Sequence, residues 1–212
     1  MSVKNIIKTS FLLSVVVGFS QAQAATFGFG CISNNLAGDC SIGEAQLFVD
    51  VTDAGAGQVL FTFTNTGTYS SSITDVYFDD GTLLGIASID DSDPGVSFSQ
   101  GASPGNLPAG NNASPPFVAT AGFTADSNPA VQPNGVNPGE YLGITFDLLS
   151  GVTYADTINA LQSGTDLRIG IHVQGFASGG SESFVNTVPV PAAVWLFGSG
   201  LLGLVAVSRR KA

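Results

Sequence analysis

Short runs of alternating apolar and polar residues restrict this chain to a β-rich fold. In "VLFTFTNTG", Val59, Phe61 and Phe63 fall on one face of an extended segment, while Thr62 and Thr64 fall on the other. A period of two is typical of a strand with one buried and one solvated face. The sequence therefore predicts a strand at 58–66 that covers a hydrophobic core.

Similar runs recur along the chain and are bounded by Gly, Asn, Asp and Pro. They predict further strands at 45–52, 72–78, 82–89, 95–99, 117–124, 141–149, 166–176 and 182–188. In 166–176, the alternation places Arg168 and His172 on the polar face. Because no βαβ alternation is present, we expect one antiparallel β-sandwich of jelly-roll or Ig-like style.

Two local motifs predict how strands are connected. Asp80-Gly81 lies between two apolar runs and suits a type I′ turn, so we expect a hairpin there. The segment "TYADTINALQSG" instead has helical spacing, with Thr153 and Asp156 at capping-box positions and Gly164 at the expected end. We expect one short helix that packs across an end of the sandwich.

Residues 1–24 have the layout of a secretory signal peptide. Lys4 and Lys8 precede the apolar stretch 11–19, and Ala22-Gln23-Ala24 provides small residues for a signal peptidase, which we expect to cut after Ala24. The alternative is an N-terminal membrane anchor, for which the apolar stretch is short. We therefore expect the chain to be exported.

The acidic residues are concentrated in the segment that follows. All 16 lie between Asp39 and Glu182, where Arg168 is the one basic residue, so this segment has a formal charge of −15. Such a charge argues against nucleic acid and anionic membrane surfaces as partners. It permits divalent cations, cationic matrix components and neutral sugars.

Cys31 and Cys40 form an even pair in a chain expected to be exported, so they predict a disulfide. Closing so short a loop would contribute about 2–3 kcal/mol. Metal binding is the alternative, but no second ligand pair is evident and the sole histidine, His172, is distant in sequence.

No set of residues in the sequence defines a catalytic site. His172 is the one histidine available as a base, no G-x-S-x-G is present, and neither phosphate-binding glycine motif occurs. The acidic residues offer many carboxylate pairs for glycoside hydrolysis without singling one out. We expect no catalytic residues.

Asp90, Asp91 and Asp93 in "SIDDSDPG" are candidate calcium ligands, since calcium takes oxygen ligands from loops. The alternative is that they are solvated turn residues. Calcium is the only cofactor that the sequence suggests.

Between residues 92 and 139, two stretches rich in Pro, Gly, Asn and Ser predict long loops. Long loops in compact domains are often functional. Phe117, Phe123 and Tyr141 flank them and could stack on sugars. The alternative is that these stretches are surface loops without a binding role.

The C-terminal segment has the features of a membrane helix. Residues 192–207 are sixteen residues without a charge, which as a helix would span roughly 24 Å. Arg209, Arg210 and Lys211 follow and predict a cytoplasmic C-terminus, with the acidic segment outside.

The order of these features resembles the PEP-CTERM sorting signal. Val188, Pro189 and Pro191 match its recognition motif, 192–207 its helix and 209–211 its basic tail. The chain departs from the eponymous Pro-Glu-Pro by having Val190 between the prolines. The resemblance implies recognition by an exosortase, a membrane-embedded cysteine transpeptidase of bacteria that make exopolysaccharide. The alternative is a plain C-terminal anchor.

Three segments are therefore expected: a signal peptide at 1–24, a β-sandwich at 25–187, called the body below, and a sorting signal at 188–212. We expect a precursor anchored in the inner membrane. Its product would be a non-enzymatic cell-surface or extracellular matrix protein associated with exopolysaccharide and biofilm. The alternative is a carbohydrate-binding or glycan-cleaving extracellular module.

Overall fold

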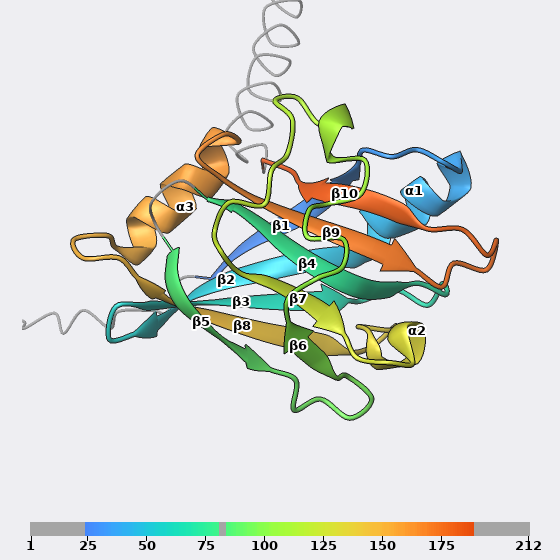
Figure 1. The fold of residues 1–212 in the computed structure, drawn as a ribbon, viewed down its shortest axis with the longest axis horizontal. Coiled ribbons are helices and arrows are strands. Elements are labelled where there is room, and N and C mark those ends of the chain that lie inside the picture. Colours follow the sequence, from blue (N-terminus) through green and yellow to red (C-terminus); the bar gives the residue numbers. More distant parts are fainter. Residues whose placement is uncertain (1–23, 81–83, 189–212) are drawn as a thin grey trace, which may run out of the picture.

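The computed structural model describes residues 24–80 and 84–188, which form a strand-rich body (Figure 1). Its strands are β1 (Ala24–Cys31), β2 (Leu47–Gly55), β3 (Gln58–Asn65), β4 (Ser72–Asp80), β5 (Leu84–Asp90), β6 (Phe98–Gln100), β7 (Thr124–Ser127), β8 (Tyr141–Leu148), β9 (Leu167–Gln174) and β10 (Glu182–Asn186). The helices are α1 (Ala37–Gln46), α2 (Val131–Asn134) and α3 (Tyr154–Ser163), with one 3-10 turn, η1 (Gly110–Asn112).

The strands form one antiparallel sheet in the order β5-β8-β3-β2-β1-β10-β9-β4-β7-β6. β1 joins the two halves of this sheet. Its first residues, 24–28, pair with β2, and its last residues, 29–31, pair with β10. The sheet therefore curls over itself, as Figure 1 shows.

This arrangement confirms the predicted antiparallel β class but not a jelly-roll or Ig-like sandwich. A sandwich has two separate sheets, whereas here hydrogen bonding continues from one half to the other through β1. The pairing partners of β1 are distant in sequence. The alternation of side chains therefore predicts the strands without predicting how the sheet is divided.

The core lies between the two halves of the curled sheet. Phe78 of β4 packs edge-on against Phe61 of β3 and Phe146 of β8, with ring centroids 5.2 and 4.8 Å apart. β4 belongs to one half and β3 and β8 to the other, so these rings connect the halves. The alternation predicted for β3 is confirmed, because Val59, Phe61 and Phe63 are fully buried.

The hairpin predicted at Asp80-Gly81 is wrong. β4 pairs with β9 and β7, whereas β5 pairs with β8 in the other half of the sheet. The chain therefore passes from one half to the other between these strands, and Gly81 itself lies outside the described residues. The dipeptide suits a tight turn, but strand pairing is decided by core packing across the sheet.

The helix predicted after residue 152 is confirmed as α3. The Thr153 hydroxyl accepts from the Asp156 backbone N–H, the Asp156 carboxylate accepts from the Thr153 N–H, and Gly164 ends the helix at φ +72°. α3 lies across one end of the curled sheet (Figure 1). α1 was not predicted, and it occupies the start of the strand expected at 45–52.

Candidate functional site

The predicted sorting segment begins where the body ends. β10 ends at Asn186, the Thr187 N–H donates to the Gly28 carbonyl of β1 at 2.8 Å, and the Val188 side chain is 44% exposed. The other predicted motif residues, Pro189 and Pro191, lie outside the described residues. So do the helix expected at 192–207 and Arg209, Arg210 and Lys211.

The N-terminal junction has a similar layout. β1 begins at Ala24, and Ala25 already pairs with Val51 of β2. A cut after Ala24 would therefore leave a mature end that starts within a paired strand. Residues 1–23 of the predicted signal peptide lie outside the described residues. Over the described ranges, no helix has the length and apolar character needed to cross a membrane.

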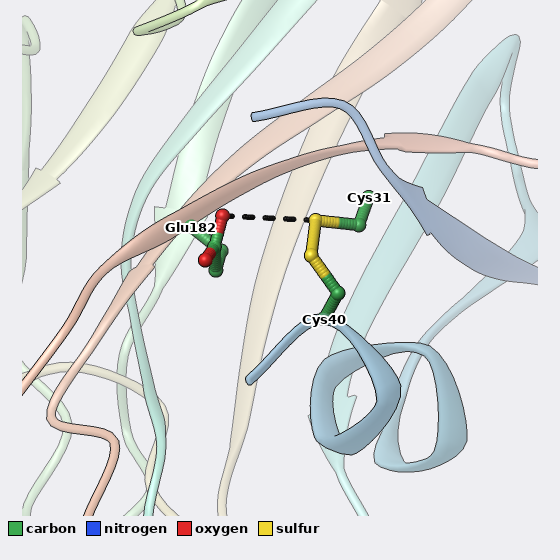
Figure 2. A group of neighbouring side chains, drawn as sticks. All are labelled: Cys31, Cys40 and Glu182. Carbon is green, nitrogen blue, oxygen red and sulfur yellow. Dashed lines mark hydrogen bonds between the residues drawn. A yellow bond between two sulfur atoms is a disulfide. The ribbon is translucent and has the colours of Figure 1, made fainter. Parts of the chain in front are cut away.

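The predicted disulfide between Cys31 and Cys40 is present and joins the end of β1 to α1. Figure 2 shows the Glu182 side chain from β10 pointing at this bond, with its Oε2 3.7 Å from Sγ of Cys31. Glu182 is fully buried, and its carboxylate accepts from the backbone N–H groups of Asn35 and Leu36 and from the Ser33 hydroxyl. It therefore holds the 32–36 loop that the disulfide closes.

Cys31, Cys40 and Glu182 also have potential metal-ligand atoms within 4.8 Å of one another. A cysteine binds a metal as the thiolate, which a disulfide sulfur cannot provide. The arrangement therefore serves to fix the loop while the bond is intact.

The three calcium candidates do not meet in a similar group within the described residues. The Asp91 carboxylate accepts from the Phe98 N–H at 2.9 Å, and the Asp93 carboxylate accepts from the Tyr141 N–H at 2.8 Å. Asp90 accepts from the Ser92 N–H at 3.2 Å. Each carboxylate thus has a backbone partner of its own, and calcium binding stays a prediction.

Residues 107–117 of the long segment 101–123 pack on the outer face of the sheet, where Leu107 and Phe117 form a cluster with Tyr77 of β4. Phe117 is fully buried, and Phe123 is 6% exposed, so neither is available to stack on a sugar. Of the three predicted aromatic residues, only Tyr141 is exposed, at 40%. The expectation of an aromatic sugar-binding surface is therefore wrong for Phe117 and Phe123, because both rings pack inside the protein.

Arg168 of β9 anchors this segment. Its guanidinium pairs with Asp79 of β4, donates to the carbonyls of Pro115 and Pro116, and lies 5.4 Å from the centre of the Phe117 ring. Arg168 was expected on the polar face, and its 6% exposure follows from the segment that covers it.

A row of polar side chains crosses the outer face of four adjacent strands. Asp126 of β7 is opposite Asp75 of β4, Asp75 is opposite His172 of β9, and His172 is opposite Ser183 of β10. His172 Nδ1 lies 3.1 Å from Ser183 Oγ. Ser183 is 1% and Asp75 5% exposed, and Asp126 and His172 are partly buried, so the row is largely shielded from solvent.

Burial controls the protonation of this row. It raises the pKa of Asp75 to about 6, and the neighbouring Asp126 charge adds to the rise while the Thr74 hydroxyl opposes it. Burial also raises the pKa of Asp126. It lowers the pKa of His172, against the opposing effect of Glu182. The row therefore favours uncharged forms of its members.

Comparison with protein families gives a match to the PEP-CTERM protein-sorting motif at residues 187–211. The match starts one residue after β10 ends and spans Val188, Pro189, Pro191 and the basic residues Arg209, Arg210 and Lys211. The chain carries a PEP-CTERM sorting signal. Comparisons with curated proteins and with solved structures give no match.

The PEP-CTERM signal implies an exported protein that an exosortase processes. It covers the C-terminal segment alone and assigns no activity to the body. The predicted sorting motif was recognisable because its residues are contiguous. Glu182 and the Asp75–Asp126 pair were missed because their partners come from other strands, and no local pattern marks such pairs.

Proposed function

We propose that this protein is a non-enzymatic component of the cell surface or extracellular matrix, associated with exopolysaccharide and biofilm. In this proposal, residues 192–207 hold the precursor in the inner membrane until an exosortase processes it. The observation that carries the proposal is the place of the PEP-CTERM match, which starts directly after the last strand of the body.

Two properties of the body support an extracellular role. Its disulfide suits an oxidising compartment, since such bonds persist mainly in exported proteins. Its formal charge of −15 favours solubility and repels anionic surfaces, so contacts with neutral sugars or cationic matrix components are favoured. The aromatic positions Phe117 and Phe123 are buried and do not support sugar stacking.

Mass spectrometry of the protein recovered from producing cells tests the processing. We expect surface material to lack residues 209–212, and we expect a Pro189→Ala, Pro191→Ala double variant to keep them. Pro133→Ala, at an exposed proline of α2, is the matched control and should be processed normally. An intact tail on all surface material of the unchanged protein would refute the proposal.

A further inference from the structure

A polar groove of about 330 Å³ lies between α2 and the connection from β3 to β4. α2 lies at the end of the curled sheet opposite α3 (Figure 1). None of the described residues that line the groove carries a charge, although the body has a formal charge of −15. The lining residues used below are Thr68, Ser70, Ser71, Ser72, Gln132 and Asn137.

Two of the lining side chains are paired inside the protein and fix the shape of the groove. Ser72 of β4 is buried, and its hydroxyl donates to the Gln132 carbonyl of α2 at 2.8 Å. The Asn137 side-chain amide donates to the carbonyls of Pro133 and Gly135 at 3.2 and 3.0 Å. These bonds connect the two sides of the groove and hold the chain that follows α2.

The connection from β3 to β4 is held from the inside by Gln46 of α1, which is 3% exposed. The Thr66 N–H donates to the Gln46 carbonyl at 2.8 Å. The Gln46 side-chain amide donates to the Tyr69 carbonyl at 2.8 Å and to the Ser71 hydroxyl at 2.6 Å. A loop that is ordered before a ligand arrives loses little conformational entropy on binding. The backbone beside the groove is therefore preorganised.

Other side chains of the groove are available to a ligand. Thr68, Ser70 and Gln132 are exposed, and their hydroxyl and amide groups have no hydrogen-bond partner among the described residues. Tyr69 lies between the first two in the chain, and its side chain is 66% exposed, the largest fraction for a large hydrophobic residue in the described ranges. Free polar groups thus adjoin an exposed aromatic ring.

These groups suit a neutral ligand that is rich in hydroxyl groups. An anion meets no basic side chain along the groove and is repelled by the charge of the body. A cation meets no carboxylate among the described lining residues. Hydroxyl and amide groups both donate and accept hydrogen bonds, as the hydroxyl groups of a sugar do. The apolar face of a sugar ring stacks on an aromatic ring.

We propose that this groove binds a neutral glycan. The side chains of Thr68, Ser70 and Gln132 hydrogen-bond to its hydroxyl groups, and the Tyr69 ring stacks on one of its sugar rings. The site would provide the contact with exopolysaccharide, a consequence that rests on the proposed function. Glycan binding itself requires neither the sorting signal nor its processing.

An array of neutral hexose oligosaccharides and uronic-acid oligosaccharides tests the binding. The probe is the purified full chain in a detergent without a sugar headgroup, and we expect it to bind neutral members and not the charged ones. Calorimetric titration with the neutral oligosaccharide that binds best then gives the Kd. Tyr69→Ala and Gln132→Ala should each weaken binding by roughly two- to tenfold, the range for one aromatic contact or one hydrogen bond. Tyr69→Phe keeps the ring and should bind more tightly than Tyr69→Ala.

Gln162→Ala is the matched control, because it removes an exposed glutamine from α3 at the other end of the sheet and should leave the Kd unchanged. Thermal unfolding identifies the variants that fold, and either Tyr69→Ala or Gln132→Ala is sufficient for the comparison. Binding to no neutral oligosaccharide, tighter binding to uronic-acid oligosaccharides, or equal affinities of all folded variants would overturn the proposal. None of these results bears on exosortase processing, which mass spectrometry of the C-terminal tail measures separately.

Discussion

At the scale of single residues, Asp75 makes the stability of the body depend on pH. Its pKa is raised by burial from 3.8 to about 6, so between these values the folded protein holds a proton that the unfolded chain has lost. The free energy of unfolding should therefore fall as pH rises from 4 to 6. The facing groups are Asp126, His172 and the buried phenol of Tyr77.

Asp75→Asn should remove this dependence and stabilise the protein at pH 7.5 by about 1–3 kcal/mol, with little change at pH 4. Urea unfolding across this pH range measures the effect. His172→Gln, in the same row of side chains, is the matched comparison for the pH profile of Asp75→Asn. Because burial lowers the pKa of His172, its contribution has the opposite sign and favours the folded state as pH rises. Identical pH profiles for Asp75→Asn and the unchanged protein would contradict the assignment.

At the scale of elements, the sequence predicted what depends on neighbouring residues. The alternation in β3 and β9 and the capping box of α3 were sufficient to predict these three elements, since each is a local pattern. β1 was missed, although Phe27 and Phe29 alternate with small residues, because the glycines and the adjacent predicted cleavage site obscured the pattern. The pairing of β4 depends on distant strands, which explains why the predicted hairpin was wrong.

α1 shows how tertiary contacts override local preference. It contains two glycines, which are weak helix formers, and its start has no side-chain cap. Gly43 is needed because a Cβ atom there would lie 2.2 Å from the Phe184 ring. The helix therefore forms where its backbone can approach β10, and it is tied to β1 by the disulfide.

Two glycine substitutions in α1 test this explanation. Gly43→Ala should destabilise the protein by about 1–3 kcal/mol, because the added methyl group overpacks the contact with Phe184. Gly38→Ala meets no atom within 4 Å and should leave stability unchanged or raise it by up to about 1 kcal/mol. Thermal and urea unfolding of both variants provide the comparison. Equal effects of the two substitutions would show that close packing does not select Gly43.

At the scale of the whole molecule, the excess of acidic side chains opposes folding of the body. Sixteen acidic side chains share the body with one arginine, and the Asp79 carboxylate already pairs with it. Repulsion among the remaining carboxylates should therefore destabilise the folded state at low ionic strength. The Debye length shortens from about 30 Å at 0.01 M salt to about 8 Å at 0.15 M, so added salt weakens this repulsion.

Raising sodium chloride over this range should therefore increase the melting temperature, by about 2–4 °C for each kcal/mol of repulsion removed. Calcium chloride at the same ionic strength separates screening from binding. If Asp90, Asp91 and Asp93 bind calcium, the melting temperature should rise further than with sodium or magnesium, because binding to the folded state adds stability. If calcium and magnesium give the same melting temperature, these three carboxylates act only through their backbone partners and the net charge. A melting temperature that does not change with sodium chloride would show that repulsion among the acidic residues is not what limits the stability of this body.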